Sequence, residues 1–424
     1  MNIININSLN KLNELLNFSN DNSIFYSKRY FGKSLKISCY DDWMKIPFLN
    51  SEDFANQIPP VDMLTRSPEK AYTFTSGGST GQPKIIYVSS EELEKNILHH
   101  GEGYKRAGIK KTDVVGTFGV PGYLSSEFTV YLGLEHTGCL IVPLGINTDP
   151  EKMLYYLQLL NVNALLVMPS DVIPLIHFLE QTKTQLNIEK IIYGGEKLYE
   201  TTKKYIQNAL NVKHFGSVFQ SMDVGTIGYK CEYCNDDEYH LNEIIQFAEI
   251  LNDKNELVGY DEIGNLVLTN LNRRLMPVIR YKTNDLVVPL SRSCSCKDNS
   301  LKFRLVGRKA DFIKIGGEQF KFNIIERVLS EIEGITGIYQ IEVYKKNGLD
   351  SLHIKIEERN IRSVKNKDLV LEDILERFLE RSFKLKDLHE KGIINPIELS
   401  FVTREHLLTS KSSGKVIKLI DDRN

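Results

Sequence analysis

A loop of small residues between two apolar segments constrains this chain more than any other feature of its sequence. The loop runs from Thr75 to Lys84; Tyr72 and Phe74 precede it, and Ile85 begins the apolar segment that follows. Short side chains let backbone N–H groups approach phosphate oxygens closely, and the lysine adds a positive charge. A flexible linker is the alternative, but an apolar strand on each side favours a phosphate-binding loop, although one without Walker A spacing. The expected ligands are Thr75, Ser76, Gly77, Gly78, Ser79, Thr80, Gly81 and Lys84.

The length of the chain and the periodicity of its apolar residues predict two domains. A chain of 424 residues is longer than a single compact core usually becomes. From Ser51 to about Val306, short apolar runs alternate with helical stretches, which predicts an α/β domain with largely parallel strand pairing. Further on, an amphipathic stripe from Leu371 to Phe378 and several alternating segments predict a small α+β domain. We therefore expect domains at residues 1–307 and 308–424.

The overall charge and the N-terminal segment exclude several classes of partner. The net charge is -2, from 53 basic and 55 acidic residues, so electrostatics give no reason to expect a nucleic acid. Residues 1–16 lack the basic start and unbroken apolar stretch of a secretion signal, and no run is long and apolar enough to span a bilayer. We expect a cytoplasmic protein without membrane insertion.

Five cysteine and histidine residues form a separate candidate site. They are Cys231, Cys234, His240, Cys294 and Cys296. Soft thiolates with one imidazole suit zinc, and a closed structural site needs four ligands, so one of the five is surplus. The close cysteine pairs lie among polar residues, which core packing does not explain. The sequence predicts a structural zinc site and leaves its fourth ligand open.

Further segments accompany the loop in a fixed order along the chain. They lie at residues 193–198 (Tyr-Gly-Gly-Glu-Lys-Leu), 219–223 (Phe-Gln-Ser-Met-Asp), 280–285 (Arg-Tyr-Lys-Thr-Asn-Asp), 307–317 and 410–418. With the loop, these segments resemble the acyl-adenylate-forming (AMP-binding) superfamily over about residues 72–415. The short chain and the sequence from Pro277 to Asp285 look most like the phenylacetate–CoA ligase branch.

The resemblance implies an ATP site and names its residues. Asp223 takes the place of the acid that holds Mg²⁺, a cation that prefers oxygen ligands. Gln220 and Met222 depart from the family pattern, which has a glycine and a serine or threonine at these places. The residues implied to contact the nucleotide, besides the loop, are Gly194, Gly195, Glu196, Phe219, Gln220, Ser221, Met222, Asp285 and Arg308.

The resemblance also implies a moving domain and a zinc set. The fold would be a large N-terminal adenylate-forming domain with mixed sheets and helices, plus a small mobile α+β C-terminal domain. Asp311 would be the hinge, and Lys415 the catalytic lysine that offsets charge on the attacked phosphate, with Lys411 as its rival. The zinc ligands would be Cys231, His240, Cys294 and Cys296, with Cys234 in reserve.

The function implied is activation of an organic acid in two half-reactions. The carboxylate of the acid, with an aromatic acid as the leading class, attacks ATP to give an acyl-adenylate and pyrophosphate. A thiol then takes the acyl group, and coenzyme A is the expected acceptor. The alternatives are the phosphopantetheine thiol of an acyl or peptidyl carrier protein, an amine, or an impaired relative that only binds nucleotide. A homodimer is retained as an alternative to a monomer.

Overall fold

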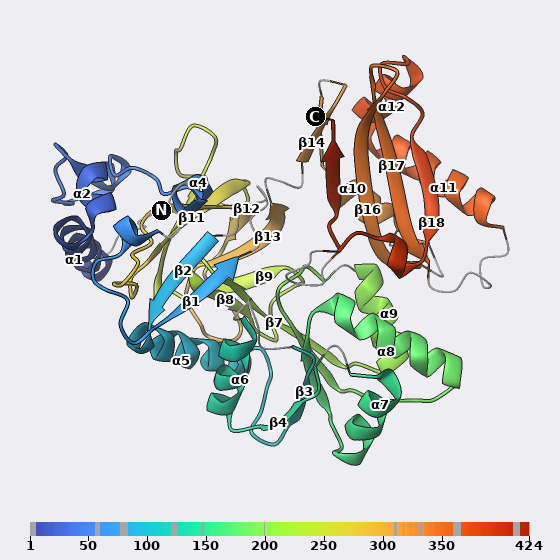
Figure 1. The fold of residues 1–424 in the computed structure, drawn as a ribbon, viewed down its shortest axis with the longest axis horizontal. Helices are drawn as coiled ribbons and strands as arrows, with labels where there is room; N and C mark the ends of the chain where they lie inside the picture. The colour runs from blue at the N-terminus through green and yellow to red at the C-terminus, as the bar shows by residue number, and fades with distance from the viewer. Residues whose placement is uncertain are drawn as a thin grey trace.

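Figure 1 presents the computed structural model of the chain. It describes residues 6–55, 60–76, 84–119, 126–145, 148–198, 200–308, 312–316, 318–321, 323–329, 331–332, 335–358, 366–409 and 416–423. Most of the predicted loop (residues 77–83), the expected hinge Asp311 and the expected catalytic Lys415 therefore lie outside the described residues.

An eleven-stranded sheet forms the centre of the molecule, in the order β10-β11-β12-β13-β9-β8-β7-β6-β5-β3-β4. Strands β3 to β7 pair in parallel, and the remaining neighbours pair antiparallel. The strands are β3 (Val114–Thr117), β4 (Leu140–Pro143), β5 (Ala164–Val167), β6 (Lys190–Tyr193), β7 (His214–Ser221), β8 (Gly225–Lys230), β9 (Glu238–Leu241), β10 (Gln246–Leu251), β11 (Gly264–Asn270), β12 (Tyr281–Leu290) and β13 (Lys302–Arg308).

The α/β class is confirmed, but the expectation of largely parallel pairing is wrong for half of this sheet. Up to β7, a helix separates consecutive strands and returns the chain to the same end of the sheet, which parallel pairing requires. After β7 a short turn through Asp223 leads directly into β8, and such a tight connection allows only antiparallel neighbours.

Helices cover both faces of the parallel half. Helices α7 (Pro150–Leu159), α8 (Pro169–Thr182) and α9 (Glu200–Leu210) pack on one face, and α5 (Ser90–Arg106) and α6 (Ser126–Thr137) pack on the other. Neighbouring residues of β5 show this division, because Leu165 packs with the first group and Ala164 with the second. Helix α5 begins at a capping box in which Ser89 and Glu92 satisfy each other's backbone N–H groups.

The antiparallel half is covered by a hairpin and by the N-terminal helices. Strands β1 (Ala71–Ser76) and β2 (Lys84–Ser89) form the hairpin, which confirms the two strands expected around the loop. The N-terminal helices α1 (Ile6–Asn22), α2 (Ile24–Tyr30) and α3 (Tyr40–Met44) share a core with Phe247 of β10, and α4 (Ser51–Ala55) follows them.

The C-terminal part has a core of its own and stands beside the large sheet in Figure 1. Its four-stranded sheet has the order β18-β17-β16-β19, and a two-stranded β14–β15 sheet precedes it. Ile338 of β16 packs against the core that lies under α9. The elements are β14 (Phe312–Ile315), β15 (Glu318–Lys321), α10 (Asn323–Leu329), β16 (Ile335–Lys346), β17 (Leu349–Glu358), α11 (Lys367–Arg381), α12 (Phe383–Glu390), β18 (Glu398–Val402) and β19 (Leu419–Asp422).

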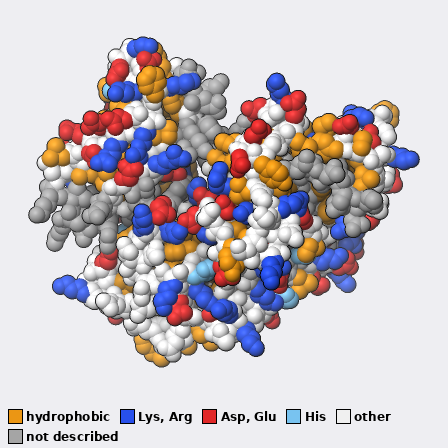
Figure 2. Space-filling model, turned by 180° about the vertical axis from the view of Figure 1, so that it is seen from behind, with side chains coloured by type: hydrophobic (Ala, Val, Ile, Leu, Met, Phe, Trp, Pro, Cys, Tyr) orange, Lys and Arg blue, Asp and Glu red, His pale blue; other side chains and the backbone are white. Residues whose placement is uncertain are grey.

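The surface matches the balanced charge of the sequence. On the face drawn in Figure 2, acidic and basic side chains lie interspersed. Among the described helices, none has the length and apolar character needed to cross a membrane.

Candidate active site

The hairpin of β1 and β2 brings the two ends of the predicted phosphate loop together. Ser76 pairs directly with Lys84 across the hairpin, so the intervening residues form its connection. Thr75 lies on β1 and Lys84 begins β2. The role of the loop in phosphate binding stays a prediction, because residues 77–83 lie outside the described part of the chain.

Lys84 lies beside two predicted motif segments that are far away in the sequence. Its Nζ lies 2.5 Å from Oδ2 of Asp223 and donates a 2.9 Å hydrogen bond to the hydroxyl of Tyr281. The Tyr281 hydroxyl in turn donates to the same Asp223 oxygen at 2.6 Å. Burial and the adjacent Asp223 charge raise the pKa of Tyr281, so the tyrosine remains a proton donor. Lys84 is therefore the counter-ion of Asp223 in this state.

Asp223 occupies the turn that joins β7 to β8 and keeps one oxygen free. Its side chain is buried, and Oδ1 accepts no hydrogen bond from any residue that the structure describes. A buried carboxylate oxygen without a partner is costly unless a ligand satisfies it. This free oxygen points to ligand binding more directly than the position of Asp223 in the sequence does.

Asp285 and Arg308 face each other on neighbouring strands of the large sheet. They are register partners of β12 and β13, and Arg308 Nε donates to Asp285 Oδ1 at 3.1 Å. Asp285 is buried, whereas most of the Arg308 side chain is exposed. The structure thus brings together two residues that the sequence assigned to the ribose and phosphate side of the nucleotide.

The predicted adenine segments end two adjacent parallel strands. Gly194 follows β6, where an added Cβ would lie 3.4 Å from the carbonyl oxygen of Val218, and Gly195 has a φ of 77°. Glu196 accepts a hydrogen bond from the backbone N–H of Ser170 at the start of α8. Phe219 packs beside the rings of Tyr239 and Phe303. These residues lie near the carboxyl ends of β6 and β7, and their contact with adenine stays a prediction.

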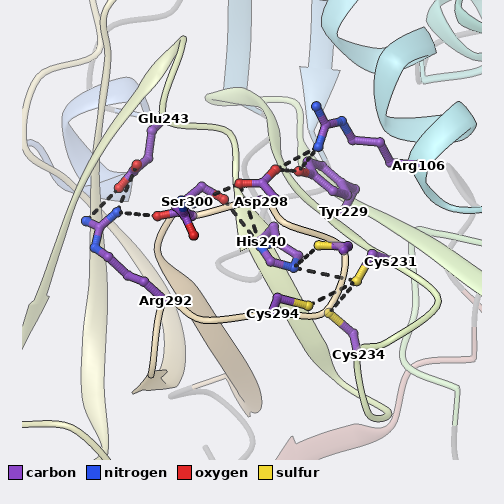
Figure 3. A network of polar contacts seen from close by, with 12 residues as sticks. Arg106, Tyr229, Cys231, Cys234, His240, Glu243, Arg292, Cys294, Asp298 and Ser300 are labelled. Atoms are coloured by element: carbon purple, nitrogen blue, oxygen red, sulfur yellow. Dashed lines mark hydrogen bonds and ion pairs between the residues drawn. The ribbon is translucent and has the colours of Figure 1, made fainter.

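Four of the five zinc candidates converge in a second cluster, away from the hairpin (Figure 3). One ligand atom from each of Cys231, His240, Cys294 and Cys296 lies within 4.8 Å of the others. His240 Nε2 faces the thiols, at 3.6 Å from Cys231 Sγ and 3.4 Å from Cys296 Sγ. Cys234 Sγ lies 3.5 Å from Cys231 Sγ. Three thiols and one imidazole at this spacing fit a tetrahedral zinc ion.

A second set of side chains holds this cluster against α5. His240 Nδ1 lies 3.4 Å from the hydroxyl of Ser300 and 4.0 Å from Asp298 Oδ1. Asp298 also accepts hydrogen bonds from Tyr229 and, at 2.8 Å, from Arg106 at the end of α5. Partners on Nδ1 leave Nε2 free for a metal, because they fix the orientation of the ring.

Comparisons with known proteins agree with the motifs. Residues 323–423 match the family described as AMP-binding enzyme C-terminal domain. The chain is 23% identical to the phenylacetate-coenzyme A ligase of Pseudomonas putida, covering 83% of this chain and 81% of that protein. These matches support the resemblance of the chain to the acyl-adenylate-forming superfamily and to its phenylacetate–CoA ligase-like branch.

Two further similarities extend over nearly the whole of the chain. Indoleacetate--lysine synthetase of Pseudomonas savastanoi is 22% identical and covers 95% of this chain and 97% of its own length. A crystal structure of 2-hydroxyisobutyryl-CoA ligase in the postadenylation state superposes with a TM-score of 0.80 at 18% identity, covering 98% of this chain and 89% of the other. The fold of the superfamily therefore extends through both the large sheet and the C-terminal part.

Sequence reasoning missed the partners of Arg280, the first residue of the fourth motif segment. The Arg280 guanidinium donates to both oxygens of Glu249, at 3.0 and 2.8 Å, and both side chains are buried. It also donates to backbone carbonyls of the N-terminal segment, including that of Trp43, whose indole donates to Glu249. The arginine thus joins the N-terminal helices to the sheet. An arginine directly after the apolar run from Met276 to Ile279 was the available signal, since a buried charge needs a partner.

Residues of the third motif segment line a cavity of about 520 Å³, including the part open to solvent. Gln220, Ser221 and Met222 form one wall, at the end of β7 and directly before Asp223. Phe74 of β1 and Thr129 of α6 contribute to other walls. The departures from the family pattern at Gln220 and Met222 thus fall on the lining of a cavity whose wall leads along the chain into Asp223.

Proposed function

We propose that this chain is an AMP-forming acid–thiol ligase. It activates a carboxylic acid with ATP to form an acyl-adenylate and pyrophosphate, and then transfers the acyl group to a thiol with release of AMP. Coenzyme A is the proposed thiol, since the phenylacetate-coenzyme A ligase of Pseudomonas putida aligns over most of both chains. The observation that carries the proposal concerns the buried carboxylate of Asp223 at the base of the loop hairpin. Its Oδ2 bonds to Lys84 and Tyr281, and its Oδ1 has no partner among the described residues.

Asp223 fits the role of a Mg²⁺ ligand on this observation. One of its oxygens lacks a partner among the described residues, and a carboxylate oxygen is the ligand that Mg²⁺ prefers. When bound, the ion would neutralise part of the phosphate charge. Lys84 would then be released from Asp223 Oδ2 and could pair with a phosphate oxygen, so that the pair exchanges partners when the nucleotide enters.

The remaining nucleotide contacts are proposed from the sequence and from nearby geometry. Asp285 would accept hydrogen bonds from the ribose hydroxyls, with Arg308 beside it. Lys415 would offset the negative charge that develops as the acid attacks the α-phosphate. Asp311 would be the hinge between a domain at residues 1–307 and one at 308–424, which the separate C-terminal core supports.

The cluster of Cys231, His240, Cys294 and Cys296 is proposed as a structural zinc site. Its donor set and spacing suit zinc, and four protein ligands leave no open position for catalysis. All six cysteines are free thiols, which supports the proposal of a cytoplasmic location. When bound, zinc would tie the segment after β8 to the segment after β12.

Pyrophosphate exchange tests the activity. Purified enzyme is incubated with ATP, Mg²⁺, labelled pyrophosphate and a panel of carboxylic acids. We expect acid-dependent exchange that falls by at least about 100-fold in Lys415→Ala, because the substitution removes a transition-state charge. Lys411→Ala is the matched control, since it removes a neighbouring lysine from the same segment and should leave exchange within about threefold of wild type. Absence of exchange with every acid, and no effect of Lys415→Ala, would leave only the nucleotide-binding alternative.

An amine acceptor is the second candidate function. The indoleacetate--lysine synthetase of Pseudomonas savastanoi aligns with nearly the full length of this chain, and its name describes joining of an acid to an amine. With the active acid identified, AMP release is measured with coenzyme A, with a phosphopantetheinylated carrier protein and with lysine. Stimulation by coenzyme A alone supports the thiol ligase; stimulation by lysine alone would replace it with an amide-forming ligase.

A further inference from the structure

The cavity is lined by the residues that directly precede Asp223, the proposed Mg²⁺ ligand, which makes it the candidate pocket for the acid. One wall is formed by Gln220 and Ser221, the residues that lead into Asp223. Phe74, which precedes the phosphate loop on β1, lies on another wall. The volume of about 520 Å³ includes space that is open to solvent, so it does not select an acid by size. The chemistry of the walls carries the selection instead.

Hydrogen-bonding groups without partners distinguish these walls. Among the residues that the structure describes, none bonds to the side chains of Gln220, Ser221 or Asn272, all three of which line the cavity and are partly exposed. Asn96 of α5 also lines the cavity. Its side-chain oxygen accepts hydrogen bonds from Thr226, and its amide N–H₂ has no partner among the described residues. The cavity therefore presents three amide or hydroxyl groups, and the amide hydrogens of a fourth, to whatever occupies it.

The charged residues of the cavity strengthen this donor character. Arg273 is buried, and its guanidinium donates only to the backbone carbonyls of Tyr87 and Met222 among the described residues. Burial lowers the pKa of Arg273 from its ordinary value. Glu92 is the acidic residue in the lining. Both of its carboxylate oxygens already accept hydrogen bonds from backbone N–H groups, including that of Leu275 at 2.7 Å. The lining thus combines available donors with a buried positive charge and no available carboxylate.

We infer that the acid activated by this enzyme carries an oxygen-bearing substituent, such as a hydroxyl, a carbonyl or a second carboxylate, that accepts hydrogen bonds from Gln220, Ser221 and Asn272. The inference rests on the proposed acid activation and names the class of its substrate. A plain aryl or alkyl acid would displace water from these groups and leave them unpaired, which sites built for hydrogen bonding penalise strongly. Phe74 and the other apolar lining residues then contact the carbon skeleton of the acid.

Matched pairs of acids test the inference through pyrophosphate exchange. Phenylacetate is compared with para-hydroxyphenylacetate, and hexanoate with adipate, so that each pair shares a carbon skeleton. We expect the oxygen-bearing member of at least one pair to have a kcat/KM about 10-fold or more above that of its hydrocarbon partner, as one or two buried hydrogen bonds would give. Asn272→Leu should lower this ratio about 10-fold, and Gln220→Leu should act in the same direction.

The controls separate this inference from the proposed activity. Asn208→Leu makes the same substitution on the exposed surface of α9 and should leave the ratio unchanged. Melting temperatures of all variants show whether they fold, and a ratio within one variant does not depend on the fraction folded. Exchange that favours the hydrocarbon member in both pairs, or a ratio unmoved by Asn272→Leu and Gln220→Leu, would overturn the inference and leave the ligase intact. Exchange with no acid at all would instead remove the proposed function.

Discussion

The ammonium of Lys84 and the carboxylate of Asp223 form a buried ion pair across 139 residues of sequence, and Tyr281 bonds to both. Asp223→Asn keeps the size of the side chain but leaves Lys84 buried without its counter-charge. We expect the free energy of unfolding to fall by about 3 kcal/mol and pyrophosphate exchange to fall at least about 100-fold. Urea denaturation and exchange assays at several Mg²⁺ concentrations measure the two effects.

A double variant separates stability from catalysis at this pair. Adding Lys84→Met to Asp223→Asn removes the uncompensated charge, so most of the lost stability should return. Activity should not return, because neither the carboxylate nor the ammonium is present. Recovery of exchange in the double variant would contradict the assignment of both residues to the nucleotide site.

The buried pair of Arg280 and Glu249 can be monitored through the single tryptophan of the chain. Trp43 donates its indole N–H to Glu249 at 2.9 Å, so Glu249→Gln changes the environment of the fluorophore. We expect a shifted emission spectrum and a loss of about 3 to 5 kcal/mol in the free energy of unfolding, because Arg280 keeps its charge without a partner. Glu256→Gln, on an exposed turn, should change neither quantity.

Metal binding should depend on a residue that does not contact the metal. We expect about one zinc ion per purified chain and a lower melting temperature after chelation, since binding free energy contributes to folding. Asp298 accepts a hydrogen bond from the backbone N–H of Ser300, whose hydroxyl lies 3.4 Å from His240 Nδ1, and its carboxylate lies 4.0 Å from the same nitrogen. Asp298→Asn removes this charge, and we expect the metal dissociation constant to rise about 10- to 100-fold. Competition with a chromogenic chelator measures it, and Asp21→Asn on the surface is the control. A chain that is free of metal and equally stable would contradict the zinc proposal.

His100 should make the stability of the fold depend on pH. It is fully buried on α5, neither ring nitrogen has a described partner, and burial lowers its pKa from 6.5 to about 4. Between these values the unfolded chain binds a proton that the folded chain does not, so stability falls as the pH falls from 6.5 to about 4. At pH 5 the loss attributable to His100 is about 2 kcal/mol relative to pH 7. Urea unfolding of His100→Leu at both pH values should lack this loss, whereas exposed His406→Gln should retain it.

Local patterns predicted most individual elements of the fold. The apolar runs around the phosphate loop became β1 and β2, the run at Lys190–Tyr193 became β6, and the stripe from Leu371 to Phe378 lies within α11. Each of these signals depends only on residues that are close in sequence. The spacing of their apolar side chains reflects the repeat of a helix or a strand. Strand direction beyond β7 was not recoverable in this way, because it depends on how short each connection is.

The site was predictable in its residue types but not in its contacts. Residue chemistry gave five zinc candidates, and the family resemblance selected four of them, whose ligand atoms do converge. The pairing of Lys84 with Asp223 could not be derived, since two charged residues so distant in sequence become partners only when the sheet and the hairpin have packed. The resemblance assigned Gln220 to the nucleotide; this residue lines the cavity before Asp223, and its contact with the nucleotide stays a prediction.

Helix α5 links the two sites of the molecule mechanically. Near its first turn, Glu92 holds the backbone of Leu275 beside the acid cavity, and at its last residue Arg106 holds Asp298 beside the metal cluster. Its 17 residues span about 25 Å at 1.5 Å per residue. A rigid rod anchored at both ends unfolds as one unit, so loosening of the cysteine cluster would expose the amides of α5 to exchange along its length. Loss of the metal or of a thiol in the cysteine cluster would thereby affect the wall of the cavity at Glu92, although this wall does not contact the cluster.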